Sequence, residues 1–376
     1  MPMTTLLTLM LSPFVSAVAH AAEPSESASL IRPPLLKFFE PPADIPPGKE
    51  YRSPLVFADG TPVRTAADWQ KRRAEILAAW HGRMGAWPPL LPRPAITVLE
   101  TRNRDEIRQH HVRIEVAPER TSDDAYLLIP PGKGPFPAVI VVYYEAKTGI
   151  GESKSELRDY AIQLACRGFV TLSYGSPPES YYPSKENAQL QPLSYHAYVA
   201  ANLHQLLANR PDVDAKRIGI VGHSYGGKWA MFASCLYDKF ACAAWSDPGI
   251  VFDESRPNVN YWEPWYLGYE PGKQRKRGVI TPENPRTGPY KQMIAEGWNL
   301  HELHALMAPR PFLVSGGSED PPSRWSALQH TVAVNNLLGF KHRVGMTNRP
   351  GHTPTPESNE QIYQFFEQVL LPKPRQ

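Results

Sequence analysis

From about residue 95 onward, apolar runs of strand length alternate with longer segments that have the apolar periodicity of helices. The apolar runs predict strands at 95–100, 107–116, 125–130, 137–144, 169–174, 217–222, 240–246, 311–317 and 341–347. The segments between them predict helices at about 154–166, 193–207, 228–236, 324–338 and 357–370. This alternation is typical of a mostly parallel, doubly wound sheet with helices on both faces, so we expect an α/β fold.

Two segments fall outside this alternation. Residues 23–94 are rich in proline and contain one clear helix, at 65–85. Residues 250–299 form an insertion that carries the aromatic sequence "YWEPWYLGYEP". We expect the first segment to be an arm packed on a catalytic domain at 95–376. Because ligands bind at the carboxyl ends of strands in open α/β sheets, we expect the insertion to lie over the active site.

The N-terminal segment predicts export. Residues 1–22 combine an apolar stretch with Ala19-His20-Ala21, an A-x-A cleavage pattern. We therefore expect a signal peptide and a periplasmic or secreted protein, while the cleavage site itself stays open. No later apolar run reaches the roughly 20 residues that a bilayer span needs, so we expect no stable membrane insertion.

Charge and cysteine content narrow the function classes further. The chain has 40 basic and 37 acidic residues, a net charge of +3, and no long basic block, so we expect no nucleic-acid partner. Its 3 cysteines each lie in apolar runs, as small buried hydrophobes do. The sequence "HELH" at 301–304 lacks the zinc motif H-E-x-x-H and a further ligand cluster, so we expect neither metal nor cofactor.

The strongest chemical signal is "GHSYG" at 222–226, which fits the G-x-S-x-G pattern of a nucleophile elbow. A strand is predicted directly before it and a helix directly after it. In that context the serine occupies a strained turn that exposes its hydroxyl above the sheet. We therefore expect Ser224 to be a nucleophile.

A serine hydroxyl needs a base and an acid that follow it in chain order. His352 lies in a loop rich in glycine and proline between the last predicted strand and the last predicted helix, and we expect it to be the base. Asp320 follows the buried strand at 311–317, which is the usual position of the acid, and we expect it to orient the histidine. The carboxylates after the preceding strand stay open as alternatives: Asp247, Asp253 and Glu254.

An oxyanion hole requires backbone N–H groups close to the nucleophile. One donor is expected from the residue after the serine, Tyr225. The second is expected from the loop after the strand at 137–144, at Tyr144 or Glu145.

With these residues in place, the chain from about 95 to 372 resembles the α/β-hydrolase superfamily. A narrower resemblance links it to bacterial carbohydrate esterases, including glucuronoyl esterases and relatives of acetyl xylan esterases. It rests on "DWQKRRAEILAAW" at 68–80 and on the extended elbow "SYGGK" at 224–228. Glucuronoyl esterases carry G-C-S-R-x-G-K here, so Gly227 and Lys228 match, whereas Tyr225 replaces the arginine that aids their oxyanion hole. The resemblance implies an α/β-hydrolase fold, ester hydrolysis and a place for Lys228 near the sugar.

These observations predict an exported serine esterase that acts on a small-molecule or oligosaccharide ester, with an acetyl or glucuronoyl group as the acyl part. We expect Lys228, Trp262 and Trp265 to bind the substrate, because aromatic faces stack on sugar rings and the ammonium donates hydrogen bonds. Packing of the insertion onto the domain is the alternative role for the two tryptophans.

Two other function classes share such a domain. A peptidase of the prolyl oligopeptidase type is one, although the roughly 70 residues after the signal leave no room for a propeller with blades of about 40 residues. A binding protein that kept the fold without catalysis is the other, because a fold does not imply a function.

Overall fold

The computed structural model describes residues 30–45, 51–153, 155–177 and 190–371. The predicted signal peptide at 1–22 lies outside the described residues. None of the helices within the described ranges combines the length and apolarity that a membrane crossing requires.

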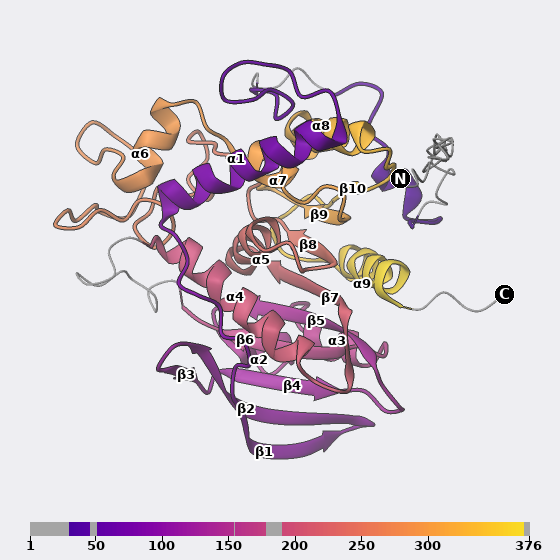
Figure 1. Cartoon of the computed structure of the whole chain (residues 1–376). Helices are drawn as coiled ribbons and strands as arrows, with labels where there is room; N and C mark the ends of the chain where they lie inside the picture. Colours follow the sequence, from indigo (N-terminus) through magenta and orange to yellow (C-terminus); the bar gives the residue numbers. More distant parts are fainter. Residues whose placement is uncertain (1–29, 46–50, 154, 178–189, 372–376) are drawn as a thin grey trace, which may run out of the picture.

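In the described residues, one sheet of ten strands forms the centre of the molecule (Figure 1). The strand order is β1-β2-β4-β6-β5-β7-β8-β9-β10, and β3 pairs with β2. The strands are β1 (Ile96–Arg104), β2 (Ile107–Ala117), β3 (Arg120–Ser122), β4 (Ala125–Ile129), β5 (Phe136–Tyr143), β6 (Val170–Gly175), β7 (Val213–His223), β8 (Cys242–Ser246), β9 (Phe312–Gly316) and β10 (Val344–Asn348). Neighbours from β6 to β10 are parallel, whereas β1, β2, β4 and β6 pair antiparallel. The parallel part brings the carboxyl ends of β5, β7, β8, β9 and β10 to one edge.

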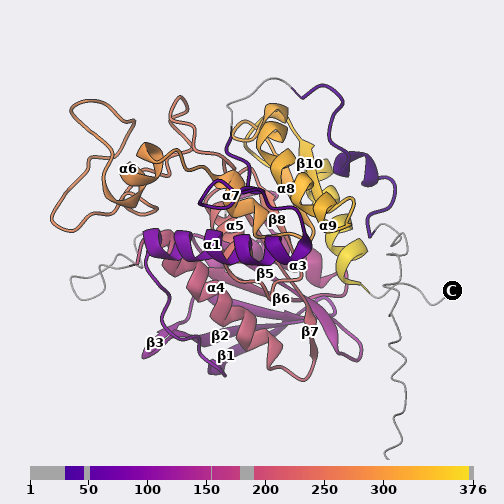
Figure 2. The same ribbon diagram turned by 45° about the horizontal axis from the view of Figure 1, so that its top comes forward.

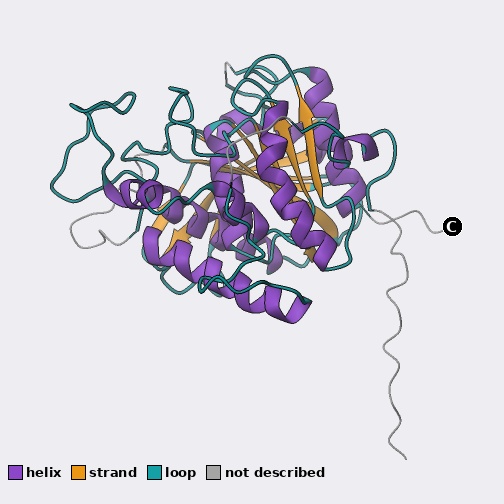
Figure 3. Ribbon diagram, turned by 90° about the horizontal axis from the view of Figure 1, so that it is seen from above, coloured by secondary structure: helices purple, strands orange, loops and turns teal. Residues whose placement is uncertain are grey.

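Helices cover both faces of the sheet (Figure 3). Alternate residues of β5 face opposite sides, so that Ile140 and Val142 join one apolar core and Val139 and Val141 the other. The first core is completed by α1 (Ala66–Met84), α4 (Pro192–Ala208), α5 (Tyr225–Leu236), α7 (Leu300–Ala305) and α8 (Trp325–Leu337). The second is completed by the 3-10 helix η1 (Leu36–Phe39), α3 (Tyr160–Ala165) and α9 (Pro356–Leu370). The α/β prediction is therefore confirmed.

The predicted helix at 154–166 is confirmed only in its second half, as α3 (Tyr160–Ala165). The chain instead forms the short α2 (Ala146–Gly149), then a loop, then α3. Gly151 and Leu157 in that loop have φ of 72° and 57°, a left-handed conformation that no continuous right-handed helix can contain. The pattern also gave no signal for three short elements: β3, α6 (Gly288–Ala295) and α7.

Helix α1 joins the N-terminal arm to the sheet domain (Figure 2). Thr65 and Asp68 form a capping box at its start. On its buried face, the ring of Trp80 lies 5.9 Å from that of Phe232 on α5. These contacts place α1 over α5 and α7.

We predict that Trp80→Ala lowers the free energy of unfolding by about 3–5 kcal/mol, because the truncation leaves a cavity between α1 and α5. Chemical denaturation followed by circular dichroism measures the change. Gln70→Ala, on the exposed face of the same helix, is the control and should change stability by less than about 0.5 kcal/mol. A Trp80 variant as stable as this control would show that α1 is not part of the cooperative core.

Candidate active site

The sharp turn between β7 and α5 places Ser224 at the carboxyl edge of the sheet. Ser224 has φ 56° and ψ −114°, a conformation that L residues rarely adopt. Two glycines make room for this turn. A Cβ on Gly222 would lie 2.3 Å from backbone atoms of Gly226, and a Cβ on Gly226 would lie 2.0 Å from the carbonyl oxygen of Val142. Both glycines of the G-x-S-x-G pattern are therefore required, because backbone segments meet here without space for a side chain.

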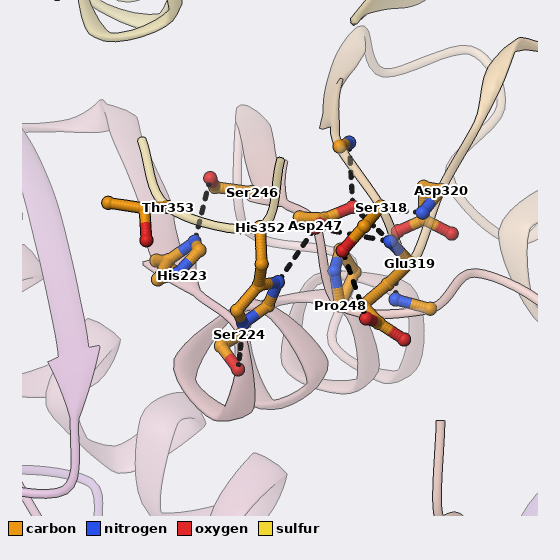
Figure 4. Close-up of polar contacts among 12 residues, drawn as sticks. His223, Ser224, Ser246, Asp247, Pro248, Ser318, Glu319, Asp320, His352 and Thr353 are labelled. Carbon is orange, nitrogen blue, oxygen red and sulfur yellow. Dashed lines mark hydrogen bonds and ion pairs between the residues drawn. The ribbon is translucent and has the colours of Figure 1, made fainter. Parts of the chain in front are cut away.

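Three side chains form a continuous hydrogen-bonded row at this edge (Figure 4). The Oγ of Ser224 lies 2.9 Å from Nε2 of His352, in the loop after β10. The Nδ1 of His352 lies 2.7 Å from Oδ2 of Asp247, directly after β8. Asp247 is fully buried, which shields this contact from water. The three residues have the geometry of a Ser-His-Asp catalytic triad, and we refer to them as the relay.

The expectation that Asp320 orients His352 is corrected by the structure, which places Asp247 there. The carboxylate of Asp320 accepts hydrogen bonds from the backbone N–H groups of Gly249 at 2.8 Å and Ile250 at 2.6 Å. It is thus directed into the loop after β8. Burial and the neighbouring charge of Asp247 raise the pKa of the Asp320 carboxyl.

Asp247 is held in turn by the loop that carries Asp320. Its Oδ1 accepts hydrogen bonds from the backbone N–H groups of Gly317 at 2.7 Å, Glu319 at 3.1 Å and Asp320 at 2.8 Å. Each aspartate side chain therefore accepts hydrogen bonds from the loop that carries the other aspartate. Asp247 is one of the alternatives that the sequence leaves open, but no pattern along the chain reveals this reciprocal arrangement.

The side chain of Tyr225 points away from the nucleophile. Its hydroxyl donates to the carbonyl oxygen of Ser176 at 2.9 Å and lies 3.1 Å from Nε2 of His196. Burial lowers the pKa of His196 to about 3, so that the imidazole is neutral. Only the backbone N–H of Tyr225 is therefore placed to face a bound carbonyl. The ring of Tyr144 stacks on that of Tyr225, with 4.4 Å between the centroids.

A pocket of about 520 Å³ opens beside the relay. Ser224, Lys228 and His352 line it on the side of the sheet domain, and the insertion lines it through Asn258, Asn260, Glu263 and Arg277, among others. Most of these groups are polar. A hollow of about 620 Å³ beside α3 and α9 is larger, yet it contains neither Ser224 nor His352. The chemistry of the lining groups, and not volume, therefore identifies the candidate site.

Lys228 is the buried cation of this pocket. Its Nζ lies 5.2 Å from the ring centroid of Tyr261 and 5.7 Å from that of Tyr266. Burial lowers the pKa of Lys228 to about 8, although the charges of Asp320 and Glu319 oppose the shift. In the part of the chain that the structure describes, Nζ forms no hydrogen bond, so its three N–H groups are available to a ligand.

The aromatic residues of the insertion mostly pack its interior. Trp262 is buried, its Nε1 donates to the carbonyl oxygen of Gly278 at 3.0 Å, and it does not line the pocket. The expected stacking role of Trp262 is therefore corrected, because its faces are covered by protein. Trp265 is half-buried, and the guanidinium of Arg277 lies 5.5 Å from its ring centroid.

No sequence pattern indicates a role for His223. Its ring lies 4.6 Å from that of His352, and its Nδ1 is 3.1 Å from Oγ of Ser246. Burial, and then the nearby charges of His352 and Arg349, lower the pKa of His223 well below its usual value. A neutral imidazole therefore supports the ring of His352. The G-x-S-x-G pattern leaves this position unspecified, so only the structure could identify it.

His301 and Glu302 of the "HELH" sequence have structural partners. The Nε2 of His301 lies 2.6 Å from the carbonyl oxygen of Arg52. The carboxylate of Glu302 pairs with Arg52 at 2.9 Å and with the buried Arg72 at 2.7 Å. These contacts tie the N-terminal arm to α7.

No protein-family model matches the sequence. The 4-O-methyl-glucuronoyl methylesterase 1 of Wolfiporia cocos is 24% identical over 345 residues, which cover 85% of this chain and 80% of the relative. Solved structures give a likeness of similar extent at lower sequence identity.

A glucuronoyl esterase from Solibacter usitatus superposes with a TM-score of 0.65 at 19% identity, covering 86% of this chain and 98% of that one. A carbohydrate esterase family 15 glucuronoyl esterase from Caldicellulosiruptor kristjansonii gives 0.62 at 21% identity, with coverage of 87% and 92%. The chain therefore has the α/β-hydrolase fold of these glucuronoyl esterases, as the sequence resemblance implied.

Proposed function

We propose that the protein hydrolyses carboxylic esters carried by a carbohydrate, with esters of a uronic acid as the first substrate class. The observation that carries the proposal is the hydrogen-bonded row of Ser224, His352 and Asp247 at the wall of a polar pocket. The names of the relatives, all ester hydrolases acting on glucuronoyl groups, support ester cleavage over peptide cleavage.

The relay performs the reaction in two steps. Ser224 Oγ attacks the ester carbonyl carbon while His352 Nε2 takes its proton, and the tetrahedral intermediate then expels the alcohol, which receives that proton. Water next attacks the acyl carbon and gives a proton to His352. The bond between that carbon and Ser224 Oγ then breaks, which releases the acid, and His352 returns the proton to Oγ. Asp247 accepts the Nδ1–H of His352 throughout and stabilises the imidazolium that forms in each step.

The oxyanion of each intermediate needs donors in place before the reaction. The N–H of Tyr225 is one, because it begins α5 and therefore has no acceptor within the helix. The second is the N–H of Tyr144 or Glu145, which follow β5 directly beside the elbow. Backbone donors here take the place of the arginine found in the glucuronoyl esterase elbow, since the hydroxyl of Tyr225 is bonded elsewhere.

Substrate selection falls to the polar wall of the pocket. The ammonium of Lys228 lies one helical turn beyond Ser224 and donates to sugar hydroxyl groups. Arg277 lines the pocket, and its guanidinium lies over the half-buried ring of Trp265, which does not line the pocket itself. An ester carried by a carbohydrate agrees with export through a signal peptide at 1–22, which we propose on the sequence pattern alone.

We predict that Ser224→Ala abolishes hydrolysis of both a p-nitrophenyl ester and a methyl glucuronate ester, because no other group can form the acyl-enzyme. Product release and covalent labelling with a fluorophosphonate, followed by mass spectrometry, measure this. Ser323→Ala, an exposed serine, is the control and should keep both properties. Labelling of wild-type protein at a residue other than Ser224, or none at all, would refute the proposed function.

We predict that Asp247→Asn lowers kcat by a factor on the order of 10³ to 10⁴, because the imidazole loses its orienting and charge-stabilising partner. Asp320→Asn should lower kcat far less, since the amide keeps one oxygen to accept from the loop after β8. Asp253→Asn, whose carboxylate pairs with Arg324, is the second comparison and should be nearly neutral for kcat. The opposite ranking of Asp247 and Asp320 would show that the acid changes place in solution.

We predict that Lys228→Met raises KM for a methyl glucuronate ester about 10- to 100-fold while sparing a small aryl acetate, because only the sugar loses charged hydrogen bonds. In the wild type, KM for the sugar ester should rise as pH passes through about 8, where the ammonium loses its proton. That rise should be absent in the variant. Lys239→Met, an exposed lysine, is the control; equal losses on both substrates would assign Lys228 to packing.

A further inference from the structure

Arg349 lies between β10 and His352 and takes no part in the proton relay described above. The residue is buried, with 7% of its surface exposed, although its guanidinium carries a full charge. Its backbone N–H donates to the carbonyl oxygen of Gly316 at 3.0 Å, which anchors the start of the histidine loop on the end of β9. The question is why a charged side chain is buried at this position.

One side of the guanidinium fixes the main chain of the histidine loop. Its Nη2 donates to the carbonyl oxygen of His352 at 2.7 Å, and its Nε donates to that of Thr353 at 2.9 Å. Gly351 and Thr353, on either side of His352, are exposed, so burial contributes little to holding this part of the main chain. The position of the imidazole therefore depends on these two hydrogen bonds.

The other side reaches β9 and the end of β8, which directly precedes Asp247. Nη1 donates to the carbonyl oxygen of Ser315 at 2.9 Å, and Nη2 lies 3.3 Å from Oγ of Ser246. Ser246 directly precedes Asp247, and its Oγ also contacts Nδ1 of His223 beneath the His352 ring. One planar group thus joins the segments that carry the base, the acid and the supporting imidazole.

Only an arginine can make this set of contacts. A guanidinium has five N–H donors in a rigid fork, whereas a lysine ammonium has three donors around one point. Within the described residues, no carboxylate lies within ion-pair distance of Arg349, so a direct salt bridge does not explain its burial. Burial lowers the pKa of Arg349, a cost that the carbonyl contacts and the nearby charges of Asp247 and Asp320 offset.

We propose that Arg349 is a positioning residue: its guanidinium sets the main chain of the histidine loop so that both imidazole nitrogens of His352 meet Ser224 and Asp247. This role rests on the proposed esterase function. Arg349 does not line the pocket, so it acts on the rate of the chemical step and not on substrate binding. An error of about 1 Å in the placement of a reacting group is enough to lower a rate about 10²-fold.

Arg310 provides a matched control for a purely structural role. Its guanidinium also donates to backbone carbonyl groups, those of Ser234 at 2.8 Å and Leu306 at 2.9 Å among them. These acceptors lie near the C-terminal end of α5, away from Ser224 at its N-terminal end. Loss of this clamp should lower stability without moving the relay.

The experiment compares Arg349→Lys with Arg310→Lys, each assayed well below its melting temperature with a p-nitrophenyl ester. We expect Arg349→Lys to lower kcat about 10²-fold with KM changed by less than about threefold, and Arg310→Lys to keep kcat within about twofold while lowering Tm. Guanidinium chloride at tens of millimolar should partly restore kcat to Arg349→Ala, whereas sodium chloride at equal ionic strength should not. Equal kcat losses in the two lysine variants, or wild-type kcat in Arg349→Lys, would overturn the proposal.

A readout that needs no turnover separates this proposal from the proposed function. The Nδ1 proton of His352, held against Asp247, should give a low-field proton resonance in the wild type and in Arg310→Lys. The resonance should be lost or shifted in Arg349→Lys. A wild-type protein without esterase activity would refute the proposed function, whereas an unchanged resonance in Arg349→Lys would refute the positioning role alone.

Discussion

The site depends on reciprocal hydrogen bonds between the loop that carries Asp247 and the loop that carries Asp320. Each carboxylate accepts backbone N–H groups from the loop that carries the other, so the loops after β8 and β9 fix one another. A buried carboxylate needs such donors, because an unpaired one is too costly to hide from water. As a result, Oδ2 of Asp247 lies 2.7 Å from Nδ1 of His352 and also accepts from the N–H of Glu319 at 3.3 Å, whereas both oxygens of Asp320 accept from the loop after β8. The same hydrogen bonds therefore stabilise the fold and set the geometry of the relay.

In the insertion, the aromatic and the polar side chains have different places. Its aromatic rings, such as those of Tyr261 and Trp262, are buried and build its interior. Its polar side chains, such as Asn258 and Arg277, face the pocket. The insertion contains little helix or strand, so its large aromatic rings form the core that holds the polar wall in place. The carbohydrate character of the proposed substrate thus rests on the polar wall and Lys228 more than on a stack of aromatic faces.

The two buried histidines near the relay, His196 and His223, are both neutral. His196 beneath Tyr225 and His223 beneath His352 both have pKa values lowered by burial, so they add shape and hydrogen-bonding capacity without adding charge. The charged side chains at the site include Asp247, Lys228 and Arg349, together with Glu263, Arg277 and Glu319 of the pocket lining. This arrangement leaves the imidazolium of His352 as the one cation that appears during the proposed reaction, facing the buried Asp247.

The α/β order of the elements, the elbow at Ser224 and the proposed base in the last loop follow from the sequence alone, because local periodicity and the small residues of a tight turn specify them. Helix α1 was equally evident, since its cap and its apolar spacing are local. The acid was decided by tertiary structure, because Asp247 and Asp320 both follow buried strands and differ only in which backbone amides their carboxylates meet. The same holds for Trp262, whose burial depends on α6 and the rest of the insertion, and for Arg349, whose partners Ser246 and Ser315 are distant in sequence. Local patterns specify which elements form, whereas hydrogen bonds between loops of neighbouring parallel strands specify which side chains meet.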